Sequence, residues 1–432
     1  MGTAHRASIL HFLADPDHVP AEQSYQYFAD GILVVEQGKI TQLGQAAEIL
    51  PTLSSDIELI THKNSLITPG FIDNHIHYPQ TEMIASYGEK LLQWLDKYTY
   101  PTETQFADEE YASTIAERFL TELLRAGTTT ALVFGTVYKA SVDAFFKACE
   151  IKNLRMICGK VMMDRNAPEA LCDTVESSYA DSKALIEKWH NRGRLRYAVT
   201  PRFAGTSSEQ QLLKAGQLLQ EHPDVYMHSH IAENTDEVGW IKELHPQRKN
   251  YLDTYDHAGL LGRRSILAHC IHLEDDEWQR MGATKTGAAF CPTSNLFLGS
   301  GLFPFSKACA HHVNIGLATD IGAGTSFSML QTLNEAYKVL QLQGEQLSPL
   351  KGFYLATLGG ATTLDLQDVI GNFATGKEAD FIVLDKSCTP FIDYRISQCK
   401  NLAEQLFVLS MLGDDRAIAE TWSAGQCVHR RD

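Results

Sequence analysis

The stretch Leu66-Ile67-Thr68-Pro69-Gly70-Phe71-Ile72-Asp73-Asn74-His75-Ile76-His77 decides the fold, because it is an apolar segment that ends in two histidines one residue apart. Successive side chains of a strand point to opposite faces, so a strand here would direct both imidazoles to the same face. Two neutral imidazoles on one face can share a metal ion. The spacing alone is a weak signal, since such pairs also occur in cores and on surfaces.

Three further apolar runs end in residues with the same chemistry. A second His-x-His pair, His228 and His230, ends one run, His269 ends another, and Asp320 ends a third. Catalytic groups at the carboxyl ends of successive parallel strands are the pattern of a (β/α)8 barrel. We therefore expect these side chains to meet at one end of such a barrel.

Eight strand candidates alternate with mostly helical segments in the middle of the chain, as a (β/α)8 barrel requires. The strands are expected at residues 65–74, 128–134, 155–163, 194–201, 225–231, 265–271, 287–291 and 314–320. Helical periodicity marks residues 112–126, 142–150, 181–190, 209–220 and 328–341, with Ser207 or Ser208 as the cap of the fourth helix. The long connection that contains residues 91–101 is expected to cover or shape the active site.

The two ends of the chain have the pattern of short strands and turns. Strands are expected at residues 8–13, 27–36, 39–43, 381–385 and 421–428. The pair Gln37-Gly38 is a hairpin turn signal. We therefore predict an α/β protein in which residues 1–66 and 371–432 together form a small β-sandwich, with a metal-dependent (β/α)8 barrel, residues 67–370, inserted between them.

The amino-acid composition restricts the kinds of molecule that the chain is expected to bind. The 53 acidic against 37 basic residues give a formal charge of −16, which argues against nucleic acid or an anionic membrane as partner. We find no unbroken apolar run long enough to cross a bilayer, and the first residues do not read as the core of a signal peptide. The nine cysteines are scattered without a Cys-x-x-Cys pair, which indicates reduced thiols. We therefore expect a cytoplasmic protein with a small-molecule substrate.

Three imidazoles and one carboxylate at these strand ends would fit one metal ion and a water molecule. The candidate ligands are His75, His77, His230 and Asp320. Spacing does not choose between His228 and His230, which share a strand face, although His230 comes later and so nearer the catalytic rim. The strand 194–201 has no lysine that could bridge a second ion, so a single metal is the better reading. Lys160, on the preceding strand, is the one residue that could change it.

A proton shuttle can also be suggested from the sequence. Glu233 follows His230 by three residues, where a carboxylate could reach both a metal-bound water and a ring nitrogen of a substrate. Asp320 could accept a proton from that water, and His269 could orient the water or stabilise developing charge. The structural alternatives are a charge at a helix N-terminus for Glu233, a helix cap for Asp320 and a core histidine for His269.

Five segments carry a resemblance to a known family over essentially the whole chain. They are PGFIDNHIHYPQ at 69–80, LLQWLDKYTYPTE at 91–103, TPRF at 200–203, HSHIAEN at 228–234 and CPTSN at 291–295. With these segments the chain resembles the amidohydrolase superfamily and, within it, the guanine deaminases, which the second and third segments mark most specifically. Asn74 stands where these enzymes usually have threonine, and Tyr100 where they often have phenylalanine; we expect neither to matter much.

The resemblance implies a barrel with a composite β-sandwich, one zinc ion per chain, a homodimer, and the hydrolysis of guanine to xanthine and ammonia. By the match, the zinc ligands would be His75, His77, His230 and Asp320. This choice favours His230 over His228. Glu233 would be the proton shuttle, and His269 would assist the metal-bound water.

The same resemblance assigns Gln80, Arg202 and Phe203 to the purine. An amide, a guanidinium and an aromatic face can read the edge of guanine and stack on its plane. Arg202 donating to the carbonyl oxygen would reject adenine, which has an amino group there. One alternative is a related deaminase of a pterin, cytosine or modified purine. Another is a non-catalytic scaffold, which would be expected to have lost ligands that are all present here.

Overall fold

The computed structural model describes residues 2–88 and 90–432. The chain folds into two compact units, each assembled from separate stretches of sequence. One unit contains the residues up to Asp73 together with Thr121–Thr130 and Phe327–Asp432, and the other contains Asn74–Leu120 and Ala131–Ser326. The domain boundaries predicted at residues 66 and 370 stay a prediction.

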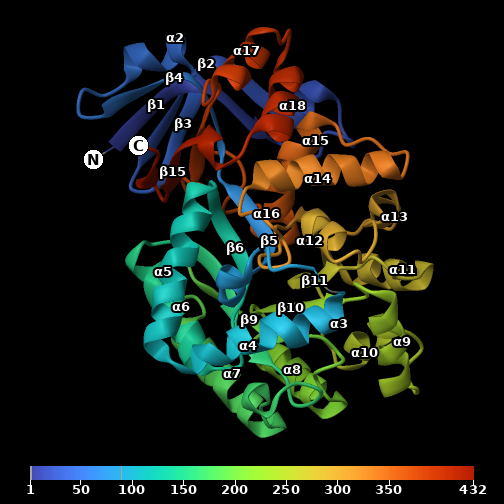
Figure 1. Ribbon diagram of the computed structural model, residues 1–432. Helices are drawn as coiled ribbons and strands as arrows, with labels where there is room; N and C mark the ends of the chain where they lie inside the picture. The colour runs from blue at the N-terminus through green and yellow to red at the C-terminus, as the bar shows by residue number, and fades with distance from the viewer. Residues whose placement is uncertain (1, 89) are drawn as a thin grey trace. The chain divides into compact units, whose positions relative to one another are not determined.

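The two ends of the chain come together, as predicted, and they form one seven-stranded sheet with the strand order β16-β15-β14-β4-β1-β2-β3 (Figure 1). Its strands are β1 (Gly2–Phe12), β2 (Tyr25–Glu36), β3 (Lys39–Gln45), β4 (Glu58–Pro69), β14 (Phe381–Asp385), β15 (Ile418–Ser423) and β16 (Gln426–Arg430). The pair Gln37-Gly38 makes the turn between β2 and β3, with φ angles of 50° and 75°. Positive φ at both central residues is the conformation that tight hairpins favour.

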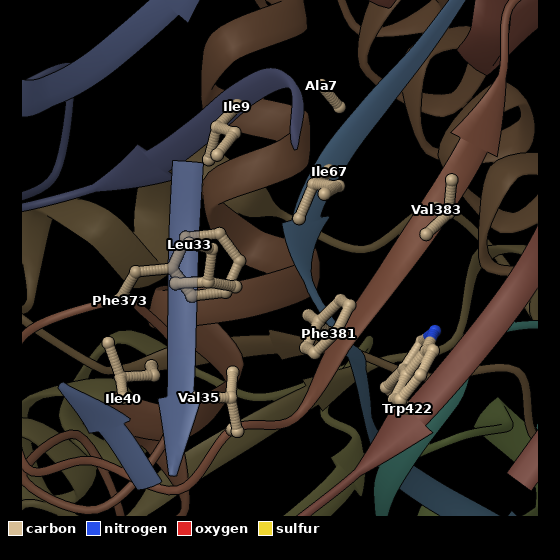
Figure 2. Packing of buried hydrophobic residues seen from close by; sticks show 11 residues of the cluster. Ala7, Ile9, Leu33, Val35, Ile40, Ile67, Phe373, Phe381, Val383 and Trp422 are labelled. Carbon is tan, nitrogen blue, oxygen red and sulfur yellow. The ribbon is translucent and has the colours of Figure 1, made fainter. Parts of the chain in front are cut away.

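An apolar cluster from both termini holds this sheet together. Figure 2 shows Ile9 and Leu33 from the N-terminal strands on the same cluster as Phe381 and Trp422 from the C-terminal strands. The rings of Phe381 and Trp422 stack with centroids 5.4 Å apart. Burying such a side chain contributes roughly 1.5–3 kcal/mol, so contacts between the two ends of the chain are a main source of stability here.

Eight parallel strands form a near-closed barrel, which confirms the predicted (β/α)8 fold. In order they are β5 (Phe71–His77), β6 (Thr128–Phe134), β7 (Arg155–Gly159), β9 (Arg196–Pro201), β10 (Tyr226–Ile231), β11 (Ser265–His269), β12 (Gly287–Phe290) and β13 (Ile315–Leu317), with the short β8 (Val161–Met162) paired to β9. Backbone hydrogen bonds link the segment after β13 back to β5: Asp320 N–H donates to the His75 carbonyl at 3.0 Å, and His77 N–H donates to the Ile321 carbonyl at 2.8 Å.

The first predicted strand, residues 65–74, is wrong as a single element, because the chain changes sheets at Gly70. Residues before it belong to β4, and residues after it belong to the barrel strand β5. Gly70 N–H donates to the carbonyl of Asp380 beside β14, whereas Phe71 N–H donates to the carbonyl of Gly127 before β6. A Cβ on Gly70 would lie 2.2 Å from the Thr129 hydroxyl oxygen, so the crossing requires glycine.

Helices lie on the outside of the barrel, with α6 against β7, and α7 and α8 against β9 (Figure 1). The longer helices are α5 (Glu109–Arg125), α6 (Lys139–Ile151), α7 (Val175–Trp189), α8 (Glu209–Glu221), α9 (Thr235–Leu244), α10 (Tyr251–His257), α11 (Asp275–Thr284), α14 (Met329–Leu342), α17 (Pro390–Ser397) and α18 (Leu402–Leu412). The shorter ones are α1 (Ala21–Ser24), α2 (Ala46–Ile49), α3 (Leu91–Trp94), α4 (Tyr100–Thr104), α12 (Pro292–Phe297), α13 (Phe305–Ala310), α15 (Pro349–Tyr354) and α16 (Gly360–Thr363).

The five helices expected from periodicity are present, with ends that differ by a few residues. Ser208, not Ser207, is the cap of α8, because its hydroxyl accepts a hydrogen bond from Gln211 N–H. Helix α7 begins six residues earlier than expected, since Thr174 and Ser177 form a capping box there. Among the residues that the structure describes, none of the helices combines the length and the apolar character needed to span a bilayer.

Candidate active site

Four side chains from three separate strand ends converge on one point. His75 and His77 end β5, His230 lies near the end of β10, and Asp320 follows β13. The Nε2 atom of His77 lies 3.2 Å from Nε2 of His75 and 3.2 Å from Nε2 of His230. The Asp320 Oδ1 atom lies 3.2 Å from Nε2 of His75 and 3.4 Å from Nε2 of His77.

The protonation of these histidines suits a cation between them. Burial, with nearby positive charges adding to it, holds the pKa values of His75, His77 and His230 well below their ordinary value, so the rings are neutral. His230 Nδ1 lies 2.7 Å from the carbonyl oxygen of Arg202, which only accepts, so that nitrogen carries the hydrogen and Nε2 keeps its lone pair. Lone pairs facing one another at this distance repel unless a cation lies between them. Three imidazoles and one carboxylate therefore fit a metal ion.

The structure separates His228 from His230, which spacing did not. His230 presents its Nε2 to the cluster of four donors, whereas His228 contacts the other ring nitrogen of His75. The Nε2 of His228 contacts Nδ1 of His75 at 2.7 Å. His228 is thus placed to orient the ring of His75, in the way that outer hydrogen bonds commonly orient metal ligands.

Lys160 is engaged away from these four donors. Its buried ammonium contacts Asp173 Oδ2 at 2.5 Å and the Val161 carbonyl oxygen at 3.2 Å. Although burial lowers the pKa of Lys160, the ion pair with Asp173 opposes that shift. These contacts explain why Lys160 is buried, so no role as a ligand of a second metal ion is needed.

Glu233 and His269 lie beside the cluster. The Glu233 Oε2 atom is 3.5 Å from Nε2 of His269, which in turn is 3.8 Å from Oδ2 of Asp320. Burial raises the pKa of Glu233 to about 7, and the charge of Asp320 adds to the shift while that of His269 opposes it. Burial alone would lower the pKa of His269, but the two carboxylates outweigh it and raise that pKa. A carboxyl group with a pKa near neutrality can both accept and donate a proton.

Three polar residues that were given no role from the sequence support these groups. Asn295 Oδ1 contacts His269 Nδ1 at 2.9 Å, and the Ser294 hydroxyl hydrogen-bonds to Asp320. The Ser300 hydroxyl donates to Glu233 Oε1 at 3.1 Å. Ser294 and Asn295 belong to the segment CPTSN at 291–295, so the signal for them was present in the sequence without an assigned contact.

Another residue without a predicted role, Glu237, holds the backbone of the Glu233 loop. Its Oε2 accepts hydrogen bonds from the backbone N–H groups of Glu233 at 2.8 Å and Asn234 at 3.1 Å. The Tyr251 hydroxyl donates to its Oε1 at 2.6 Å. Glu237 therefore fixes the position of the backbone from which the Glu233 side chain extends.

A pocket opens onto the cluster. The residues predicted to bind the substrate, Gln80, Arg202 and Phe203, all line it together with Glu233. The segment 91–104, built from α3, the π-helical turn η3 (Leu95–Thr99) and α4, adds an apolar wall. This wall consists of Leu91, Trp94 and Leu95. The structure thus brings all the predicted site residues together, and their individual roles stay predictions.

Comparison with known proteins agrees with this geometry. The model of the amidohydrolase family matches residues 66–428. A guanine deaminase of Escherichia coli is 54% identical over 407 residues, which cover 94% of this chain and 93% of that protein.

Solved structures are similar over the whole chain. The structure of E. coli guanine deaminase superposes with a TM-score of 0.97 at 52% identity and covers 100% of both chains. A guanine deaminase from C. acetobutylicum, solved with guanine bound in its active site, has a TM-score of 0.89 at 28% identity and covers 99% of this chain and 100% of its own.

Proposed function

The chain belongs to the amidohydrolase family, and on this premise we propose that it hydrolyses guanine to xanthine and ammonia. The observation that carries the proposal is the composition of one pocket. It joins a cluster of metal-type donors and a carboxyl group of raised pKa to a guanidinium, an amide and an aromatic ring. The similarity to proteins named guanine deaminase supports the same substrate.

One zinc ion per chain is part of the proposal, with His75, His77, His230 and Asp320 as its ligands. When bound, zinc lowers the pKa of a water molecule toward neutrality and so supplies a nucleophile. Neutral imidazoles and a carboxylate are the ligands that zinc accepts, and the ion pair of Lys160 with Asp173 supports a single ion.

Glu233 carries the proton in this scheme. Its carboxylate accepts a proton from the attacking water and delivers it to the ring nitrogen next to the amino-bearing carbon of guanine. The water oxygen forms a bond to that carbon, the carbon–nitrogen bond to the amino group breaks, and the amino group leaves as ammonia with the second proton of the water. Asp320 accepts the second proton of the water and passes it to the leaving amino group. His269 orients the water and stabilises the negative charge that develops on its oxygen.

Arg202, Gln80 and Phe203 select the substrate. The Arg202 guanidinium donates to the carbonyl oxygen of guanine, Gln80 contacts the ring edge, and the Phe203 ring stacks on the purine plane. Adenine has an amino group at the position of that carbonyl, so its N–H groups would face the N–H groups of Arg202. A donor facing a donor leaves both unpaired in a buried pocket, which strongly disfavours adenine.

The test is ammonia release from guanine, adenine, cytosine and a pterin by protein whose zinc content has been measured. We expect turnover of guanine only, with a loss of at least about a hundredfold in Arg202→Gln and none in the exposed control Arg118→Lys. Turnover of another heterocycle in place of guanine would assign the site to a related deaminase. A protein that binds zinc tightly and turns over none of the four would contradict the proposal.

A homodimer and a cytoplasmic location complete the proposal. The homodimer rests on the family resemblance, and the location rests on the composition of the chain. Sedimentation velocity at several protein concentrations tests the first. A species with twice the chain mass of 48.1 kDa is expected, and a single species at the mass of one chain would contradict the dimer.

A further inference from the structure

Glu103 is a buried carboxylate for which the reaction scheme gives no role. It lies in α4, at the end of the segment 91–104, and its side chain is 1% exposed. A carboxylate withdrawn from water is unfavourable unless charged or polar groups compensate it. The groups that contact Glu103 therefore indicate its role.

Arg202 is the first of these contacts. Its Nη1 donates to both oxygens of the Glu103 carboxylate, at 2.7 and 3.0 Å, and the Arg202 side chain is 3% exposed. The guanidinium carbon also lies 5.8 Å from the ring centroid of Tyr100, in the same helix as Glu103. Two groups of one short helix thus fix the position of the guanidinium that lines the pocket.

Gln80 is the second contact of the same carboxylate. Its Nε2 donates to Glu103 Oε1 at 3.2 Å, while its Oε1 accepts from Gly322 N–H at 3.1 Å. A carboxylate only accepts and a backbone N–H only donates, so these two contacts leave the amide one orientation. Glu103 therefore holds two of the three side chains assigned to the purine.

The charge of Glu103 also sets what the pocket accepts. A lone buried guanidinium would favour an anion, whereas an Arg–Glu pair is neutral overall and leaves N–H groups of the guanidinium to an uncharged carbonyl. Guanine is such a neutral lactam. Its product xanthine has one more carbonyl and is the stronger N–H acid, so it forms an anion more readily.

We propose that Glu103 is a specificity-determining positioning residue, which neutralises and aims Arg202 and orients Gln80 so that the pocket prefers a neutral lactam to an anionic ring. This assignment rests on the proposed function. It also gives the segment 91–104 a part in recognition besides that of an apolar wall, since the segment supplies the charge that defines the polar side of the pocket.

The test compares zinc-loaded Glu103→Gln with the wild type and with Thr104→Ala, a control in the same helix whose hydroxyl donates to the Tyr100 carbonyl of that helix. The substrates are guanine and diaminopurine, which carries an amino group in place of the carbonyl. We expect a rise of about tenfold or more in KM for guanine, a smaller change in kcat, and a loss of about tenfold in the preference for guanine. Xanthine should inhibit the variant more strongly than the wild type, increasingly so at alkaline pH.

Glu103→Asp decides the question if the glutamine variant does not fold, because it keeps the charge and shortens its reach. It should retain weak xanthine inhibition while losing part of the preference for guanine. Equal losses on both substrates, with xanthine inhibition unchanged, would reduce Glu103 to a structural residue and overturn the inference. Zinc-loaded wild type that does not convert guanine would overturn the proposed function itself, which is a separate result.

Discussion

At the scale of single residues, the groups around Glu233 determine the pKa of its carboxyl group. Burial raises its pKa to about 7, Asp320 adds to this shift, and the charged His269 and the Ser300 hydroxyl oppose it. An acid–base group works best when its pKa lies near the pH at which it acts. The pocket therefore gives one carboxyl group the properties needed to accept a proton and then return it.

Replacing Glu233 by glutamine tests the shuttle directly. The amide keeps the size of the side chain but cannot accept the proton, so kcat should fall by about a hundredfold to ten-thousandfold. Steady-state kinetics with guanine measures this fall, and zinc analysis should show that the metal is retained. Glu243→Gln, an exposed change in the same helical region, is the control and should have no effect. A variant of Glu233 with wild-type kcat would exclude the shuttle role.

The hydrogen bond from Ser300 predicts a shift in the pH profile. Its hydroxyl stabilises the ionised form of Glu233, so its removal in Ser300→Ala should raise the pKa of Glu233 above about 7. At a given acidic pH less Glu233 is then ionised, and the acidic limb of kcat/KM should move to higher pH by up to about one unit. Ser397→Ala, on the exposed face of α17, should leave the limb in place. Movement toward lower pH would contradict the assignment.

At the scale of secondary-structure elements, the closure of the barrel depends on a contact between its first and last strands. Asn74, in β5, is buried and its amide donates to the Leu317 carbonyl at 3.3 Å. The Asn74 side chain packs directly against Gly316 in β13. A Cβ at position 316 would lie 2.2 Å from that side chain, so the contact requires glycine. The residue expected to matter little from the sequence therefore lies at the seam that brings His75 toward Asp320.

Gly316→Ala should consequently destabilise the protein. Forcing a methyl group into a packed contact typically lowers the free energy of unfolding by about 1–3 kcal/mol. Thermal or urea unfolding measures the change, and adding Asn74→Ala, which removes the clashing atoms, should recover part of it. Gly239→Ala in helix α9, where a Cβ meets no atom within 4 Å, should be neutral or stabilising. Equal stability of the Gly316 and Gly239 variants would show that the seam is not tightly packed.

At the scale of the whole molecule, the metal-type side chains of the site come from distant parts of the sequence. His75 and Asp320 are 245 positions apart in the chain, yet their side chains lie 3.2 Å apart in the fold. The unfolded chain does not hold these groups together, so a cation that binds them stabilises the folded state. Metal binding and folding stability should therefore be linked.

Removing the metal should lower both activity and stability. A ligand at about one hundred times its dissociation constant stabilises the folded state by about 2.7 kcal/mol, so a chelator should lower the Tm by several degrees. Zinc should restore the Tm and the activity together. His230→Ala should lose this response, whereas His257→Ala, an exposed change, should keep it. A Tm unaffected by chelation of protein shown to contain zinc would contradict the site.

Much of this fold followed from local patterns, while the supporting contacts did not. The alternation in β5 and β10 placed His75, His77 and His230 at strand ends without knowledge of the structure. The break at Gly70 escaped prediction, because the apolar run continues through it and only the pairing partners change. The contact of Ser300 with Glu233 spans 67 positions, and no local pattern reports such a pairing.

The most direct test of the central claim is product analysis after zinc-loaded protein acts on guanine in water enriched in heavy oxygen. We predict one molecule of ammonia for each molecule of xanthine, with one heavy oxygen atom on the carbon that carried the amino group. This result would establish hydrolysis at that carbon. Guanine recovered unchanged from protein with a full complement of zinc would contradict the claim.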